Sequence, residues 1–168
     1  MFQTYLSQMA QNAQSILSLA TGISAEQARW KPDPQSWSIL EVINHLHDEE
    51  QSDFRVRLDI ILHDPARDWP PIDPEGWVAS RQYNQRDLAD SLKNFLVERE
   101  RSLAWLRGLG QPNLEASVTT RFGSMRAGDM FASWVAHDIL HLRQLVELRY
   151  AWGREQFAPY DPRYAGEW

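Results

Sequence analysis

The chain contains no cysteine. This absence excludes a thiol nucleophile, a disulfide scaffold, and zinc or iron–sulfur sites with cysteine ligands. Long apolar runs are also missing, and none reaches the roughly 20 residues that span a bilayer. The first twenty residues carry no charge and no continuous apolar segment, unlike a secretory signal. We therefore expect a soluble, cytoplasmic protein.

Positive charge is in deficit, since 17 Lys and Arg stand against 23 Asp and Glu and give a formal net charge of −6. An acidic balance disfavours non-specific binding to nucleic acid or to an anionic membrane. A chain of 168 residues can bury a core without cross-links. The expected partner is a small-molecule substrate, with no nucleic acid and no membrane.

Four segments place apolar residues at steps of three and four, which predicts amphipathic helices. Within the second, Ser38 and Glu41 have the S-x-x-E spacing of a capping box, and Pro65 stops the helix. In the third, the run "VERERS" is interpreted as a solvated face. The four predicted helices cover residues 2–20, 38 to about 62, about 86–107, and 128 or 129 to about 152.

Residues 63–84 contain four prolines and form too long a connection for a tight turn. Such a connection lets two successive helices run in the same direction. The sequence therefore predicts an all-α four-helix bundle over residues 1–152, with a long crossover connection between helices two and three. Residues 116–128 should form an extended loop or a small hairpin. The tail, residues 153–168, should pack on the bundle or on a partner.

The segment "AHDILHLRQL" places His137 and His141 four residues apart, so that they share one helix face. Both lie on an apolar stripe between Trp134 and Leu145. Two unpartnered histidines on a buried face would cost several kcal/mol, and a shared metal ion would remove that cost. Imidazole suits zinc, nickel, copper and iron.

A third ligand must come from another helix, and helix two offers His45 and His47. His47 lies nearer the centre of the apolar stripe, whereas His45 lies on a mixed arc that would suit the wall of a wet site. Spacing alone does not choose between them. His63 follows the end of helix two, where a histidine can interact with the last carbonyls and the helix dipole.

Two other kinds of metal site fit the sequence less well. Reading "HDILH" as an H-E-x-x-H zinc motif would put Asp138 in place of a glutamate base, one methylene too short, and would need Glu147 as a later ligand. A di-iron bundle needs Glu-x-x-His on two helices, and no Glu-x-x-His occurs in the sequence.

The motifs "WSILEVINHLHDEE" and "FGSMRAGDMFASWVAHDILHLRQL" together resemble the DinB/YfiT-like superfamily of small metal-binding helical proteins. In that pattern the first histidine follows a tryptophan by eight residues, which falls on His45 counted from Trp37. An acid often stands where Asp48 stands, and the H-x-x-x-H pair maps to His137 and His141. The resemblance covers about residues 1–150.

The resemblance implies a bundle that binds a divalent metal, zinc or nickel, through His45, His137 and His141. It favours His45 over His47, which stays a fallback because the helix phase does not rule it out. The remaining positions would hold water or substrate, as in catalytic zinc sites. Some relatives are thiol-dependent transferases or isomerases, so a low-molecular-weight thiol is a candidate cosubstrate.

Two functions compete. The first is a metal-dependent enzyme, a thiol S-transferase or a small hydrolase, in which Asp48 or Glu49 orients a ligand or acts as base. The alternative is a non-enzymatic, stress-related binding or dimerisation module whose metal is structural or vestigial. Aromatic residues in the tail and loops favour a homodimer. A substrate-sized cleft opening onto the metal would distinguish the two.

Overall fold

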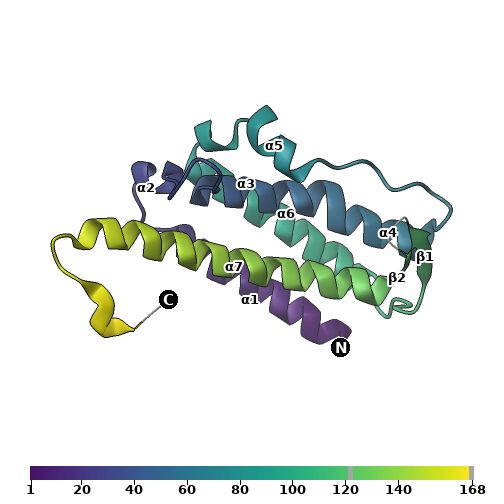
Figure 1. Ribbon diagram of the computed structural model, residues 1–168. Coiled ribbons are helices and arrows are strands. Elements are labelled where there is room, and N and C mark those ends of the chain that lie inside the picture. Colours follow the sequence, from purple (N-terminus) through teal and green to yellow (C-terminus); the bar gives the residue numbers. More distant parts are fainter. Residues whose placement is uncertain (121–122, 167–168) are drawn as a thin grey trace.

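The computed structural model describes residues 1–120 and 123–166, and its body is a bundle of long helices (Figure 1). Helix α3 continues through a π-helical segment, η1, into α4, so these three elements make one long rod. The bundle helices are α1 (Phe2–Ala20), α3 (Ile39–Glu49) with η1 (Glu50–Phe54) and α4 (Arg55–His63), α6 (Leu88–Gly108) and α7 (Ala127–Phe157).

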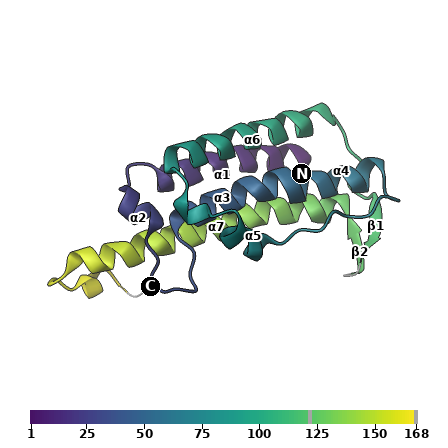
Figure 2. The ribbon, with the colours of Figure 1, turned by 90° about the horizontal axis from the view of Figure 1, so that it is seen from above.

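The rod α3–α4 and helix α6 run in the same direction, and α1 and α7 run the opposite way (Figures 1 and 2). The long connection between α4 and α6 makes this possible, because the chain must return along the whole bundle before α6 begins. The prediction of an all-α four-helix bundle with a long crossover is therefore confirmed.

Several short elements decorate the bundle and were not predicted individually. The crossover carries α5 (Pro74–Ser80) and η2 (Tyr83–Gln85), and α2 (Ala25–Arg29) precedes α3. The predicted hairpin is formed by the antiparallel strands β1 (Ser117–Thr120) and β2 (Gly123–Arg126). The tail contains η3 (Pro162–Ala165).

The start of the second helix follows from its sequence. Ser38 Oγ accepts a hydrogen bond from the Glu41 amide at 3.1 Å, and Glu41 Oε2 accepts one from the Ser38 amide at 2.8 Å, which is the reciprocal capping box. The helix ends at His63, where the residue before Pro65 cannot easily stay helical.

Helix α7 is longer than predicted, since it runs through Gly153 and ends at Phe157 rather than near Trp152. A helical glycine is less favourable than alanine by only about 1 kcal/mol, which packing can offset. Here a Cβ on Gly153 would lie 3.2 Å from Cζ of Phe157, so the glycine leaves room for that ring. Described tail residues from 158 onward are largely exposed; Tyr160, for example, is 82% exposed.

The core consists of two apolar clusters separated by a polar layer. One cluster surrounds Phe131 and Trp134, and the other surrounds Ile43 and Phe95. Between them every bundle helix contributes buried polar side chains. The principal members of this polar layer are Asn12, His45, Glu50, Arg99 and Asp138.

The interpretation of "VERERS" as a solvated face is wrong. Arg99 is 2% exposed and Glu98 and Ser102 are also buried. Arg99 lies one turn after Phe95 and one turn before Leu103, so it belongs to the apolar stripe of α6 despite its charge. Over the described residues, no helix combines the length and hydropathy needed to cross a bilayer.

Candidate metal centre

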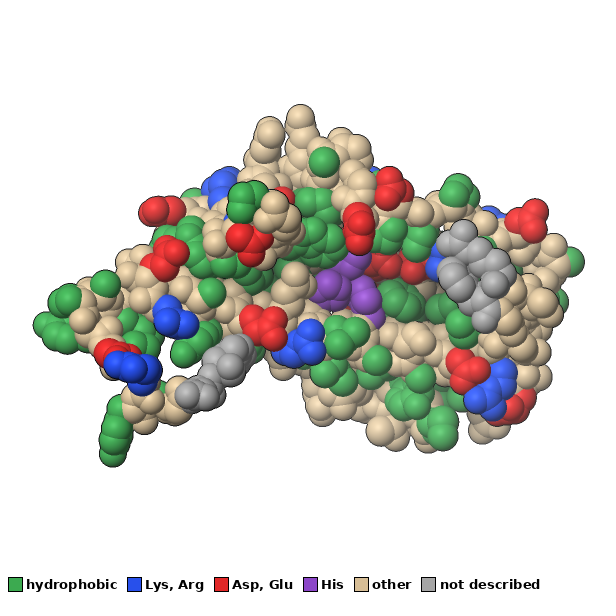
Figure 3. Space-filling model, viewed as in Figure 1, with side chains coloured by type: hydrophobic (Ala, Val, Ile, Leu, Met, Phe, Trp, Pro, Cys, Tyr) green, Lys and Arg blue, Asp and Glu red, His purple; other side chains and the backbone are tan. Residues whose placement is uncertain are grey.

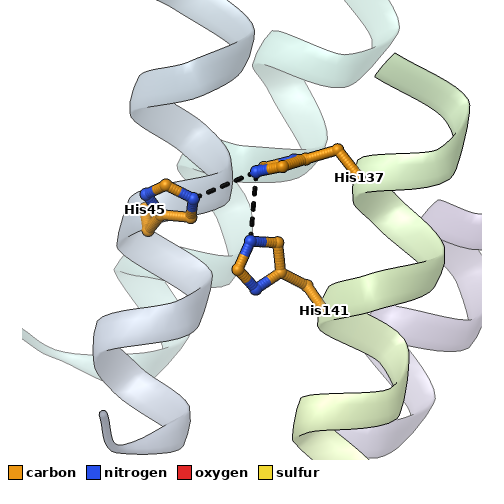
Figure 4. Close-up of side chains that lie close together, drawn as sticks. All are labelled: His45, His137 and His141. Atoms are coloured by element: carbon orange, nitrogen blue, oxygen red, sulfur yellow. Dashed lines mark hydrogen bonds between the residues drawn. The ribbon is translucent and has the colours of Figure 1, made fainter. Parts of the chain in front are cut away.

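Three histidines from two helices meet in the polar layer. His45 projects from α3, and His137 and His141 project from α7 toward it (Figure 4). The Nε2 atom of His137 lies 3.2 Å from Nε2 of His45 and 3.1 Å from Nε2 of His141. The three side chains each offer a ring nitrogen within 4.8 Å of the others.

This spacing fits a shared metal ion. Nitrogen ligands about 2.0–2.1 Å from a tetrahedral zinc lie about 3.3 Å from one another, close to the separations found here. His137 Nε2 faces two other ring nitrogens, and in a neutral imidazole it is either one donor or one acceptor, so it cannot make a full hydrogen bond to both. The nitrogen donors also match zinc or nickel.

The histidines are held in the neutral form that ligation requires. Burial, with the neighbouring histidines, lowers the pKa of His45 to about 3 and that of His137 to about 2. Burial also lowers the pKa of His141. Because a protonated imidazole cannot bind a metal ion, the lowered pKa values keep all three lone pairs available near neutral pH.

Neighbouring side chains orient the rings. His141 Nδ1 lies 2.8 Å from Gln144 Oε1, so Nδ1 carries the proton and Nε2 faces the cluster. The Trp37 ring is stacked nearly parallel to His141, with an interplanar angle of 3°, and packs against His45. These contacts fix the imidazole planes before any ion binds.

The structure places His47 outside the cluster. The helix turns by about 100° per residue, so two residues after His45 the side chain points to another side of α3. His47 Nδ1 lies 3.2 Å from Asp48 Oδ1 instead. His63 is exposed, with Nδ1 2.8 Å from Asp59 Oδ1, so its partner is a side chain one turn earlier.

Asp48 is buried, and its carboxylate interacts with residues of the crossover connection between α4 and α6. Its carboxylate accepts a hydrogen bond from the Tyr83 hydroxyl and pairs with Arg81 Nη1 at 2.7 Å. Burial alone would raise its pKa, but hydrogen bonds from His47, Tyr83 and Arg81 lower it to about 2. This carboxylate ties the crossover to α3 and has little basicity.

Glu49 has a different environment. It lies one turn after His45 on the same face of the helix and is 4% exposed. Burial and the nearby Asp53 carboxylate raise its pKa to about 8. Its Oε1 atom has no hydrogen-bond partner among the described residues. A carboxyl group with a pKa near neutrality is suited to proton transfer.

Asp138 points away from the histidine cluster. It is fully buried, and its Oδ1 and Oδ2 atoms each accept a hydrogen bond from Arg99 at 2.7 Å. Such a two-point pair leaves no carboxylate free to act as the base of an H-E-x-x-H motif. Glu147, the ligand that this alternative needs, pairs instead with Arg143 at 3.3 Å.

Arg99 links Asp138 to a second buried carboxylate. Its Nε donates to Glu50 Oε1 at 2.7 Å, and Trp134 Nε1 donates to the same oxygen at 2.8 Å. The Trp134 ring is stacked on Phe54, which packs against His137. The cluster of Glu50, Arg99 and Asp138 is called the buried charge cluster below. It is linked to His137 through the side chains of Trp134 and Phe54.

Sequence reasoning missed this cluster and the residues around the ligands. Glu50 and Arg99 were hidden in runs of charged residues that resembled solvated faces. The burial of Arg99 could have been predicted from its place on the helix, because it lies on the apolar stripe between Phe95 and Leu103. Trp37 was recognised as a motif residue, but its stacking on His141 depends on the packing of distant helices.

A cleft of about 1350 Å³ lies next to two residues that contact His141, although none of the three histidines lines it. Its walls come from the loop before α3, the last turns of α7 and the tail. Trp37 and Gln144 line it, and both contact His141. Figure 3 shows histidine side chains in a hollow of the surface, beside acidic side chains. The cleft lined by Trp37 and Gln144 runs along the last turns of α7.

The lowered histidine pKa values predict an acid-sensitive metal-free protein. Below about pH 6.5 the unfolded chain takes up protons on His45 and His137 that the folded protein, with pKa values of about 3 and 2, does not take up, and the pKa of His141 shifts in the same direction. Burial raises the pKa values of Glu49 and Asp53, which offsets part of this difference. The free energy of unfolding should therefore decrease as the pH is lowered from 7 to 5, by about 1.4 kcal/mol per pH unit for each proton by which the unfolded chain exceeds the folded protein. Urea unfolding of chelator-treated protein at several pH values measures this slope.

Two variants identify the groups responsible for this slope. His137→Leu should reduce it by about one proton, or about 1.4 kcal/mol per pH unit. His63→Ala, which alters an exposed histidine outside the cluster, should leave it unchanged. An equal slope in His137→Leu and in the parent would contradict the assignment.

Comparison with known proteins places this fold. The sequence profile of the DinB superfamily matches residues 8–145. YfiT from Bacillus subtilis, described as a probable metal-dependent hydrolase with an unusual four-helix bundle topology, has 16% identity and a TM-score of 0.79, covering 90% of this chain and 87% of that chain. That likeness shows the fold alone. Among curated proteins, none matches the sequence. Because the profile spans most of the chain, this protein belongs to the DinB superfamily.

Proposed function

We propose that this protein is a metal-dependent enzyme in which His45, His137 and His141 bind one divalent ion, zinc or nickel. The observation that carries the proposal is the convergence of three neutral Nε2 atoms at 3.1–3.2 Å within reach of a cleft. Three protein ligands leave coordination positions open, which is the pattern of catalytic rather than structural zinc.

The bound ion would supply Lewis-acid chemistry, since it lowers the pKa of a water or thiol that it binds. The chain supplies a group for proton transfer. Glu49, one turn from His45 and with an unpartnered Oε1, is the best placed carboxyl group, and its raised pKa lets it hold or release a proton near neutral pH. Asp48 is a positioning residue, because Tyr83 and Arg81 hold its carboxylate.

Two reaction classes suit this arrangement: hydrolysis of a small molecule, and transfer to the sulfur of a low-molecular-weight thiol. The chain has no cysteine, so in the second class the sulfur would arrive with the cosubstrate. Both need a pocket beside the ion, and the cleft next to Trp37 and Gln144 provides one.

The test compares zinc-loaded, chelated and reloaded protein on a panel of esters and amides and on a panel of thiol–electrophile pairs. Turnover should require the metal. In Glu49→Gln it should fall about 10²–10⁴-fold while metal content stays near one per chain, because only the proton-transfer group is lost. Product formation is followed by absorbance or chromatography.

Glu100→Gln is the matched control, because Glu100 is an exposed glutamate on α6 that pairs with Arg107. It should keep full turnover. If Glu49→Gln were as active as this control, the role of Glu49 would be lost. If the metal-loaded protein turned over nothing on either panel, the enzyme proposal would fail for these two reaction classes.

A second candidate is a binding or dimerisation module with a structural metal. It is supported by exposed aromatic side chains at the end of α7 and in the tail, where Phe157 is 44% and Tyr160 82% exposed. Such groups favour a homodimer contact. An inert protein that retains its metal and sediments as a dimer would favour this candidate over the enzyme.

A further inference from the structure

The buried charge cluster behind the histidines is not neutral. Glu50 and Asp138 contribute two negative charges, and Arg99 contributes one positive charge; their side chains are 1%, 0% and 2% exposed. The other groups that bond to them are uncharged: the Trp134 indole, the Asn12 amide and the Met9 carbonyl. Across residues 1–120 and 123–166, no second cation pairs with either carboxylate. One negative charge is therefore in excess.

The excess negative charge is least well compensated at Glu50. Its Oε1 accepts from Arg99 and Trp134, but its buried Oε2 has no hydrogen-bond partner in the described part of the chain. A buried carboxylate oxygen without a donor is unfavourable, and so is a buried charge without a counter-charge. Both features leave the charge of Glu50 incompletely compensated and able to stabilise a cation bound nearby.

The histidine cluster is the adjacent place for such a cation. Asp138 lies between His137 and His141 in the sequence, and Glu50 is connected to His137 through the stacked rings of Trp134 and Phe54. The medium between them is largely aromatic and apolar, so charges act over longer distances there than in water. The three imidazoles are neutral and bring no charge of their own.

We propose that the buried charge cluster is the electrostatic counterpart of the metal ion, with Glu50 supplying the excess negative charge that stabilises a bound divalent cation. In the metal-free protein the same uncompensated charge lowers the free energy of unfolding. This inference rests on the metal-binding part of the proposed function and is independent of the reaction catalysed.

Glu50→Gln tests the inference, because glutamine keeps the shape and an oxygen for Arg99 and Trp134 while it removes the charge. The Zn²⁺ dissociation constant, measured by competition with a chromophoric chelator, should rise about tenfold or more. The melting temperature of the metal-free variant should stay within about 3 °C of the parent or rise, since the excess charge is gone.

Glu98→Gln is the matched control. Glu98 is also a buried carboxylate, but it is balanced by Arg55 and by Arg101 at 3.0 Å. Its loss should lower the metal-free melting temperature and leave Zn²⁺ affinity within about twofold, which is the reverse of the pattern for Glu50→Gln. A purely structural cluster would make the two variants behave alike.

The outcomes separate the two proposals. If the parent protein binds no zinc, the proposed function fails. If the parent binds zinc and Glu50→Gln binds it equally well, or if Glu50→Gln unfolds without metal, only the electrostatic inference is overturned.

Discussion

Purified His141→Ala and His45→Ala should each contain close to no divalent metal, whereas the parent should contain about one ion per chain. Removing one of three nitrogen ligands leaves two, and the neighbouring carboxylates of Asp48 and Asp138 do not replace it because arginine side chains hold both. Elemental analysis of dialysed protein measures the stoichiometry, and competition titration measures the loss of affinity.

His47→Ala is the decisive control for this experiment. It removes a histidine from the same helix, two residues from His45, whose side chain contacts Asp48 rather than the cluster. It should retain a full complement of metal. If His47→Ala lost the ion and His45→Ala kept it, the assignment of ligands would be reversed, and stoichiometric metal in His141→Ala would remove that residue from the site.

The second large effect is expected for Arg99→Met. Methionine fills much of the same volume, but the change leaves Glu50 and Asp138 buried without a counter-charge. Breaking a buried ion pair in this way costs about 3–5 kcal/mol, a large share of the roughly 5–15 kcal/mol by which proteins are stable. Denaturant unfolding followed by circular dichroism should therefore show a much weaker fold.

Arg101→Met provides the comparison, since Arg101 is a neighbouring arginine on α6 whose side chain is 67% exposed. Its pair with Glu98 should contribute no more than about 1 kcal/mol. Equal free energies of unfolding for the two variants would mean that the buried ion pairs of Arg99 do not stabilise the polar layer.

Much of the fold could be predicted because its signals are local. The capping box at Ser38 and Glu41, the stop at Pro65 and the proline-rich crossover depend on a few neighbouring residues each. The end of α7 could not be predicted in the same way. From the sequence alone, Gly153 predicts the end of the helix. The structure shows that the ring of Phe157 packs next to this glycine.

The site was predictable in part. The spacing of His137 and His141 placed both on one face of a helix, but phase could not choose between His45 and His47. The reason is that α3 is covered on nearly all sides: residues 39–46 are all buried, so an apolar stripe does not mark one inward face. The family resemblance selected His45, which the structure places beside the pair.

Arg99 shows where composition misleads. A run of alternating charges usually faces water, and here one of its members lies in the centre of the bundle. Only the step of four residues from Phe95 and to Leu103 reveals it. Its partners, Glu50 and Asp138, come from other helices, and no local pattern pairs them.

The polar layer also bears on how the four helices align along their length. Apolar clusters of similar side chains tolerate a slip of one helical turn, about 5.4 Å, because leucine can replace leucine as a neighbour. A two-point pair such as Arg99 with Asp138 does not tolerate this slip, because a shifted α7 would place the Asp138 carboxylate against the apolar cluster around Phe131. Buried polar groups are known to specify register in helical assemblies. The polar residues next to the histidine cluster thereby also select one register for the bundle.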